Sequence, residues 1–404
     1  MASDTTTLAP PSQGLTAYRR VLAAPRVRPL VAFGLPARMP IGMGAVALIL
    51  FVHGRTGSFG EAGVVAGAYT IGLGITGPLL ARLIDRRGSR LVIVPGALVV
   101  MAALVAVVVL GEAGAGTVPL VLAALLAGAG ATPIGGIMRQ RWAELVGPGE
   151  LATAYALDAV TMEVVFVSGP LLAGVLAATV GAAAGLIVAG VLGLVGSAGF
   201  AHLSTVRPGG DPDAERHWLG ALASPHLRLL ILSELPLAGT FGALDVTLPA
   251  FGAHHGAAAL GGAFAAALAL GSGVGGLAFG ARPGIFGPPR RSLPLLGGLM
   301  VLTCLPLPAA TGVPEMFVFA AIAGVTLAPQ ITVRNQVVQS TLVAGTATEA
   351  FTWTVLATTI GASIGSALVG PLVQAAGWRA GALVAVALPA VATLILLARR
   401  DLIE

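Results

Sequence analysis

The chain has 404 residues, of which 56% are hydrophobic and only 10% charged, and its mean hydropathy is +0.94. Soluble globular domains carry roughly 25% charged residues, so this composition excludes that class of protein. A transmembrane β-barrel is also excluded, because its segments of about ten residues alternate between apolar and polar positions, and the chain shows no such alternation.

The first segment, residues 1–29, is polar, contains proline and ends in a group of arginines. It lacks the short apolar core and the cleavage site of a signal peptide. We therefore expect residues 1–29 to form a cytoplasmic tail.

Apolar runs of about 20 residues recur after this tail, and each is long enough to cross a hydrocarbon core of roughly 30 Å. They predict an all-α integral membrane protein with twelve spans. The spans are expected at 30–53, 61–84, 91–111, 118–142, 151–178, 182–202, 227–251, 257–280, 293–311, 315–339, 348–375 and 379–399.

The longest loop, residues 203–226, is polar and divides the spans six and six. We therefore expect an N-terminal six-helix bundle over 30–202, a cytoplasmic linker over 203–226, a C-terminal six-helix bundle over 227–399 and a short cytoplasmic end at 400–404. The single cysteine, Cys304, lies in an apolar span and excludes an intramolecular disulfide.

The arginines predict which side of the membrane each loop occupies. The chain has 22 basic residues, and all of them are arginine. With the N-terminus inside, the outer loops hold only Arg55 and Arg379, whereas nearly all other arginines fall on inner loops, tails and helix ends. Basic residues favour the cytoplasmic side, so both termini are expected in the cytoplasm of a cell in whose inner or plasma membrane the protein lies.

The two halves show traces of a sequence repeat. Arg139-Gln140 near the end of span 4 and Arg334-Asn335 near the end of span 10 are 195 residues apart, and Ala152-Thr153 and Ala347-Thr348, which open spans 5 and 11, have the same offset. These matches favour two pseudo-symmetric six-helix bundles, an arrangement found in rocking transporters.

The stretch from Ala81 to Arg90 places five charges in the tight inner loop between spans 2 and 3. It resembles the Gly-x-Leu-x-Asp-Arg-x-Gly-x-Arg loop of the major facilitator superfamily, and it departs from that pattern only at Ala81. The matching residues are Leu83, Asp85, Arg86, Gly88 and Arg90.

This resemblance implies that the loop is a conformational latch between the two bundles on the cytoplasmic side. Its aspartate, Asp85, would bind the start of span 11 near Thr348 and Glu349, because a carboxylate is favoured at a helix N-terminus. Glu349 is itself acidic, so an arginine such as Arg334 is expected to neutralise it.

Span 5 carries a second resemblance. Residues 168–174 look like the Gly-Pro-x-x-Gly-Gly element of drug:proton antiporters in the same superfamily, with matching residues Gly169, Pro170 and Gly174. The alternative is a generic kink, because proline and glycine are frequent in membrane helices. Span 11 has a related pattern, as the packing of two symmetry-related helices would require.

Ionisable residues inside spans are costly and are therefore candidates for function. Arg139 and Asp158 flank one inner hairpin at similar depth, and Arg334 and Glu349 flank the equivalent hairpin of the second half, so a salt bridge is expected in each. Both pairs could be structural or act as latches. The remaining intramembrane candidates are Arg38, Glu163, Glu234 and Asp245.

Glu163 and Asp245 lack an obvious partner nearby in the sequence. Apolar surroundings favour the protonated form of a carboxyl group, as a proton carrier requires. We expect one of these two residues, with Asp158 and Glu234 as weaker candidates, to couple proton movement to transport. The alternative is that each carboxylate caps a kink or hydrogen-bonds a neighbouring helix.

Four aromatic residues are candidates for the wall of a substrate cavity, although packing or lipid contact would equally explain them: Phe166, Phe241, Phe351 and Trp353. Trp142 and Trp378 stand at span ends and are expected to be interface anchors. His254 and His255 lack further ligands for a metal site. No nucleotide-binding loop and no catalytic set is present, so we expect neither an enzyme nor a cofactor.

The sequence therefore predicts a secondary transporter of the major facilitator type, driven by a proton gradient and exporting small, partly hydrophobic compounds. The alternatives are an uptake permease for a sugar, organic acid or other nutrient, and a membrane scaffold or sensor that transports nothing. The expected partners are the substrate and the lipid bilayer, with no nucleic acid, and a monomer suffices for this fold.

Overall fold

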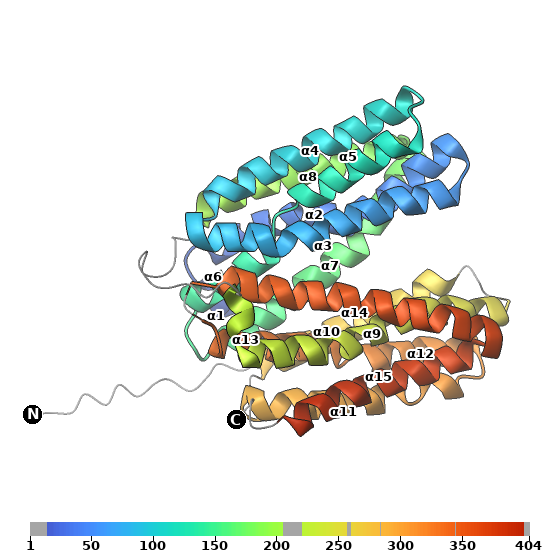
Figure 1. Ribbon diagram of the computed structural model, residues 1–404. Coiled ribbons are helices and arrows are strands. Elements are labelled where there is room, and N and C mark those ends of the chain that lie inside the picture. Colours follow the sequence, from blue (N-terminus) through green and yellow to red (C-terminus); the bar gives the residue numbers. More distant parts are fainter. Residues whose placement is uncertain (1–13, 205–219, 257–259, 283, 344, 400–404) are drawn as a thin grey trace, which may run out of the picture.

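The computed structural model describes residues 14–204, 220–256, 260–282, 284–343 and 345–399. Within them the regular structure is helical (Figure 1). The helices are α1 (Leu15–Ala23), α2 (Val27–Thr56), α3 (Phe59–Arg87), α4 (Arg90–Glu112), α5 (Thr117–Gly130), α6 (Ile134–Leu145), α7 (Leu151–Thr179), α8 (Ala182–Leu203), α9 (Pro225–His254), α10 (Gly261–Ala281), α11 (Pro289–Cys304), α12 (Val313–Gly324), α13 (Leu327–Ser340), α14 (Ala347–Ala376) and α15 (Trp378–Ala398), with 3-10 turns η1 (Gly220–Ala223) and η3 (Leu307–Ala309).

Twelve helical segments of the described residues are long and apolar enough to cross a membrane, which confirms the expected number of spans. The largest differences in their starting points are at spans 8 and 9, which begin at Gly261 and Pro289. Most of the expected linker, residues 205–219, and the C-terminal residues 400–404 lie outside the described residues.

Spans 4 and 10 are each built from two helices rather than one. Span 4 breaks between α5 and α6 at residues 131–133, and span 10 breaks between α12 and α13 at residues 325–326. Pro133 has no backbone N–H to donate, which accounts for the first break. Because the two breaks occupy equivalent positions in the two halves, they support the expected internal repeat.

The helices form two bundles, one from α2 to α8 and the other from α9 to α15 (Figure 1). In the first bundle α2 packs on α7 and α8, and in the second the equivalent helix α9 packs on α14 and α15. The bundles meet along two seams, α3 with α14 and α7 with α10, and α6 adds contacts to α14.

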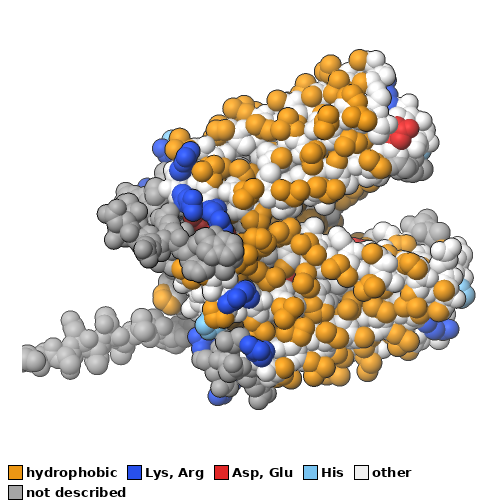
Figure 2. Space-filling view, viewed as in Figure 1, with side chains coloured by type: hydrophobic (Ala, Val, Ile, Leu, Met, Phe, Trp, Pro, Cys, Tyr) orange, Lys and Arg blue, Asp and Glu red, His pale blue; other side chains and the backbone are white. Residues whose placement is uncertain are grey.

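The two bundles are joined at one end only. A single buried apolar cluster contains residues of both bundles, among them Ile84, Trp142, Tyr155, Phe279 and Phe351. The other two clusters each stay within one bundle. Figure 2 shows the matching shape, in which a wedge opens between the bundles at the end opposite α1 and α6. We call these the closed end and the open end.

The N-terminal tail contains a helix that was not predicted from the sequence. Helix α1 packs on α2, α7 and α10 at the closed end, with Ala17, Tyr18 and Val21 buried. The Tyr18 hydroxyl donates to the backbone oxygen of Leu277 at 3.0 Å, and the Gly14 N–H donates to that of Ala281 at 2.6 Å. Residues 14–23 are therefore part of the closure rather than a free tail.

The two tryptophans expected to anchor the membrane interface are instead buried. Trp142 is 1% exposed and belongs to the cluster that joins the bundles, and Trp378 is 4% exposed. Trp378 packs edge-on against Phe251, with 4.8 Å between ring centroids. A position at the end of a span does not distinguish an indole that faces lipid from one that packs inward.

Candidate functional site

The closed end is held by Asp85 in the last turn of α3. One carboxylate oxygen accepts from the Thr348 N–H at 3.2 Å and the other from the Glu349 N–H at 2.9 Å. The first N–H groups of a helix have no partner within the helix, and the helix dipole favours an anion there. The expected contact between Asp85 and the start of α14 is therefore present.

Glu349 is paired with Arg82, not with Arg334. The guanidinium of Arg82 donates from Nε to Oε2 at 3.2 Å and from Nη2 to Oε1 at 2.6 Å, and the indole of Trp353 reaches Oε1 at 3.4 Å. The expected pairing of Arg334 with Glu349 is wrong. Arg82 was not among the expected latch residues, although it stands one helical turn before Asp85 on the same face.

The other residues of the charged loop act within the N-terminal bundle. Gly88 ends α3 with φ of 88°, a conformation that favours glycine. Arg90 donates to the backbone oxygens of Ala201 and His202 at the end of α8. Arg86 is exposed. Of the five residues expected to form the latch, only Asp85 and Glu349 are brought together.

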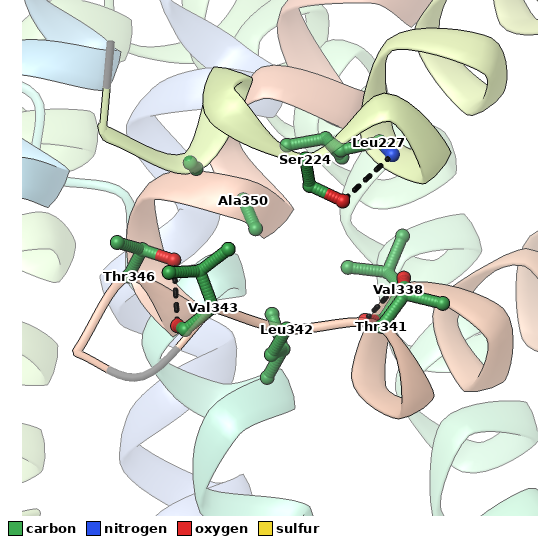
Figure 3. A pocket seen from close by; sticks show the side chains of 9 residues that line it. Ser224, Leu227, Val338, Thr341, Leu342, Val343, Thr346 and Ala350 are labelled. Carbon is green, nitrogen blue, oxygen red and sulfur yellow. Dashed lines mark hydrogen bonds between the residues drawn. The ribbon is translucent and has the colours of Figure 1, made fainter. Parts of the chain in front are cut away.

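The loop before α14 is fixed against the start of α9. Figure 3 shows Thr346 and Val343 of this loop on one side of a small cavity and Ser224 and Leu227 on the other. The Ser224 hydroxyl caps α9 by accepting from the Leu227 N–H, and the Thr346 hydroxyl donates to the Val343 oxygen. This packing positions the N-terminus of α14 for Asp85.

The N-terminal bundle contains a buried cluster of three charges. Oδ1 of Asp158 in α7 lies 2.7 Å from Nη2 of Arg38 in α2. The other carboxylate oxygen, Oδ2, lies 3.4 Å from Nε of Arg139 in α6. The expected pairing of Arg139 with Asp158 is present, and Arg38 joins it. Each of the three side chains is 8% exposed or less.

The C-terminal bundle contains a buried pair instead. Arg334 of α13 lies 2.6 Å from Glu234 of α9 and also donates to the oxygens of Leu230 and Ser233. Glu234 accepts from Thr358 of α14 at 2.7 Å. The repeat thus keeps the arginine of α6 and α13, but its carboxylate comes from the fifth span of one half and the first span of the other.

Glu163 lies on the second seam between the bundles. Its carboxylate accepts a hydrogen bond of 2.7 Å from Ser272 of α10, and the side chain is partly buried. Nearer the closed end of the same seam, Thr153 donates to the backbone oxygen of Gly280 at 2.7 Å. Asp245 of α9 is exposed and forms no hydrogen bond or ion pair with any residue the structure describes.

One glycine of the antiporter-like element, Gly169, has a packing role. A Cβ at Gly169 would lie 2.6 Å from the backbone carbon of Gly42, so this glycine lets α7 approach α2. Gly174 has open space around its Cα, and Pro170 lies inside α7. Close packing of α7 on α2 accounts for Gly169.

The four aromatic candidates do not share one cavity wall. Phe351 is fully buried in the closure, 6.3 Å from the ring of Tyr155, and Trp353 contacts Glu349. Phe241 packs within the C-terminal bundle, and Phe166 is 53% exposed. The described residues hold no group of three His, Cys, Asp or Glu side chains placed to bind a metal.

Two pseudo-symmetric six-span bundles with buried charges, joined by polar contacts between α3 and α14 at one end, define the architecture of a membrane transporter. Residues 33–305 match the Major Facilitator Superfamily, and the chain belongs to that family. The all-α structure with twelve spans is the fold of this superfamily. No curated protein matches the sequence.

Solved structures with this fold include a bacterial homologue of the iron transporter ferroportin in an outward-facing state, with a TM-score of 0.72, 17% identity and coverage of 92% of this chain and 98% of that chain. The human organic anion transporter MFSD10 has a TM-score of 0.68, 14% identity and coverage of 94% and 99%. The E. coli fucose:proton symporter has a TM-score of 0.68, 14% identity and coverage of 93% and 98%. At these identities the likeness is one of fold.

Proposed function

We propose that this transporter couples proton movement to the export of small, partly hydrophobic compounds by alternating access. The observation that carries the proposal is the hydrogen bond from Ser272 to Glu163. It joins the two bundles, and its acceptor is a carboxylate without a basic partner among the residues the structure describes. Adding a proton to Glu163 therefore acts directly on a contact that must change when the bundles rock.

The other candidate carboxylates are less suited to carry the proton. Asp158 is held by two arginines and Glu234 by Arg334, and an arginine stabilises the ionised form of a carboxylate. Asp245 is exposed and has no hydrogen bond or ion pair with any described residue of the other bundle. Glu163 is the candidate whose protonation would change a hydrogen bond between the two bundles.

The orientation fits the export cycle and fits an uptake cycle equally, because both cycles pass through an outward-open state. With the arginine-rich loops in the cytoplasm, the closed end faces inward, both termini are cytoplasmic and the wedge opens outward. This is the state in which an exporter releases its cargo and takes up a proton. The proposal places a monomer in the cell membrane, with the proton gradient as its energy source and no cofactor.

An uptake permease for a sugar, organic acid or other nutrient is the second candidate. The buried polar network of Arg334, Glu234 and Thr358 favours it, because paired polar groups suit a hydrophilic substrate. Export rests on the predominantly Ala, Gly, Leu and Val composition of the spans and on the element at Gly169, Pro170 and Gly174.

Reconstitution in liposomes with an imposed pH gradient tests the proposal. Candidate efflux compounds and sugars are compared while internal pH is followed. We expect Glu163→Gln to abolish transport driven by the pH gradient, while Glu150→Gln, a carboxylate change just before α7, leaves it intact. Gradient-driven transport that persists at the wild-type rate in Glu163→Gln would refute Glu163 as the proton carrier, and sugar accumulation would support the permease.

A further inference from the structure

The buried charges of the two bundles do not balance in the same way. In the C-terminal bundle one arginine, Arg334, faces one carboxylate, Glu234, so the pair is neutral. In the N-terminal bundle Arg38 and Arg139 share the single carboxylate of Asp158, which leaves one positive charge over. An uncompensated charge at this depth is costly, so the cluster favours one additional anion.

The arginines also differ in how their donors are used. Arg334 is 2.6 Å from Glu234 and donates to the oxygens of Leu230 and Ser233. Arg139 touches Asp158 only through Nε, at 3.4 Å, and its two terminal nitrogens donate to none of the residues the structure describes. The side that a planar guanidinium offers to a carboxylate or phosphate is therefore vacant in Arg139.

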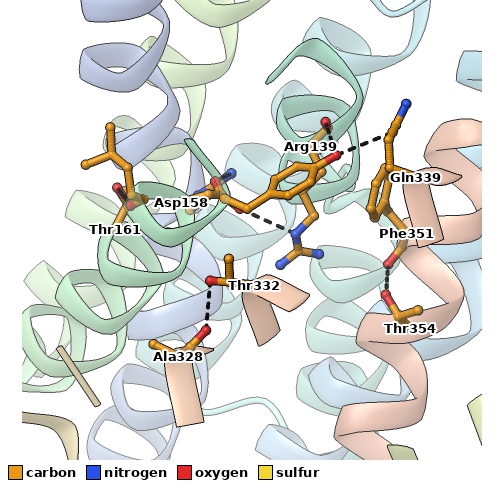
Figure 4. A network of polar contacts seen from close by, with 11 residues as sticks. Arg139, Asp158, Thr161, Ala328, Thr332, Gln339, Phe351 and Thr354 are labelled. Carbon is orange, nitrogen blue, oxygen red and sulfur yellow. Dashed lines mark hydrogen bonds and ion pairs between the residues drawn. The ribbon is translucent and has the colours of Figure 1, made fainter. Parts of the chain in front are cut away.

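This vacant side lies where the two bundles meet. Figure 4 shows the guanidinium of Arg139 directed away from α6 toward the space between Thr332 and Thr354, which belong to the C-terminal bundle. The neighbouring Tyr155 hydroxyl reaches Gln339 of α13 at 3.4 Å. A group bound to Arg139 would therefore contact both bundles, as a compound carried between two rocking bundles must.

We propose that Arg139, backed by Arg38, binds an oxyanion group of the transported compound, which is a carboxylate, sulfonate or phosphate. One monoanion brings the charge of the cluster to zero. Asp158 holds the two arginines in place in the empty protein. This inference rests on the proposed transport function and names the chemical class of its cargo, a small amphipathic anion whose apolar part lies among the aliphatic spans.

Ligand binding to the purified full-length protein tests this inference without a proton gradient. The probes are benzoate, benzenesulfonate and phenyl phosphate, with benzamide as the neutral match for benzoate, and thermal stability is measured at constant ionic strength. We expect at least one of the three anions to stabilise the protein in a saturable way, and benzamide to have no effect. The proposal would be overturned if none of the three anions stabilised the protein, or if benzamide stabilised it as strongly as they do.

Four variants then locate the site. Arg139→Gln should weaken the apparent affinity about tenfold or more, since it removes a charged bidentate donor, and Arg139→Lys should weaken it less. Asp158→Asn should strengthen it, because it removes the competing carboxylate. Arg228→Gln, at an exposed arginine, is the control and should change nothing. Undiminished affinity in Arg139→Gln would place the anion elsewhere.

The opposite signs expected for Arg139→Lys and Asp158→Asn keep the test decisive if Arg139→Gln does not fold. The binding result is also separate from the proton result. Saturable anion binding without any pH-driven transport would contradict the proposed coupling and leave the anion site standing, whereas pH-driven transport of uncharged compounds without anion binding would do the reverse.

Discussion

Arg82 and Glu349 form a two-point ion pair between α3 and α14, with distances of 3.2 and 2.6 Å. The pair resolves a conflict at the start of α14, where Asp85 and Glu349 bring two carboxylates to one helix end. The Asp85 carboxylate accepts hydrogen bonds from the backbone N–H groups at this helix end, and the Arg82 guanidinium pairs with the Glu349 side chain. Two sets of polar contacts, those of Arg82 and those of Asp85, therefore join α3 to α14 at the closed end.

Removing Arg82 should weaken the closed end. Arg82→Gln leaves Glu349, which is 2% exposed, without its counter-charge beside Asp85. Because Arg82 itself is 31% exposed, we expect a cost of about 1–2 kcal/mol, below the 3–5 kcal/mol typical of a fully buried pair.

The effect of Arg82→Gln on the balance between the two conformations is measurable as the distance between two spin labels. The labels are attached through the substitutions Ala113→Cys and Ala253→Cys at exposed positions of the open end. Weakening the latch should shorten that distance as the open end closes. The single native cysteine, Cys304, is buried and should not react. An unchanged distance distribution would show that the hydrogen bonds of Asp85 to the start of α14 are enough to hold the closed end.

Gly220 should be intolerant of a side chain. It has φ of +56°, and a Cβ there would lie 2.5 Å from Oε2 of Glu349 and 2.7 Å from Nη2 of Arg82. Gly220→Ala should cost roughly 1–2 kcal/mol from backbone strain alone, and should also disturb the ion pair. The distance between the same two spin labels measures the effect of Gly220→Ala on the closed end. Gly174→Ala is the control, because open space surrounds Gly174. Equal behaviour of the two variants would contradict the expectation.

Tyr18 should stabilise the closure through its hydroxyl. Tyr18→Phe removes the hydrogen bonds to the backbone oxygens of Gly276 and Leu277 and should cost about 1 kcal/mol. Burial raises the pKa of Tyr18 from 10.0 to about 12, so the hydroxyl stays a donor at physiological pH. Its contribution is fully present below the unfolded pKa and is lost only as the pH rises through the folded one. A cost that varies around neutral pH would point to another group.

The pair in the C-terminal bundle should be more costly to break than to replace. Arg334→Met leaves Glu234 buried and unpaired and should cost about 3–5 kcal/mol of stability. Adding Glu234→Met should recover part of that loss, since no buried charge remains. Thermal unfolding of the two variants in detergent decides, and a double variant less stable than Arg334→Met would show that the network around Thr358 matters more than the charge.

The sequence predicted the spans and the contact of Asp85 with the start of α14, and each prediction has a physical reason. A span is a local property, because every backbone group in lipid must be satisfied within its own helix and the side chains must be apolar. The contact from Asp85 to the start of α14 was predicted through a resemblance, and it depends mainly on backbone N–H groups that any helix start provides.

The partners of Arg334 and Arg82 could not be predicted in the same way, although Arg139 does pair with Asp158 as expected. Arg334 pairs with Glu234 of a distant span and Arg82 with Glu349, because partner choice depends on which helix faces meet after the bundles pack. The same holds for Ser272 with Glu163, and for α1, whose short amphipathic sequence gains its stability from docking.

The sequence by itself therefore determined the class of molecule, the number and limits of its spans and the charges they carry, since hydropathy acts residue by residue along the chain. Only the tertiary structure decided that the bundles close at one end, that Glu163 faces the opposite bundle and that Arg139 keeps its terminal donors unused. Those features depend on the relative rotation of packed helices, which the linear order of residues does not specify.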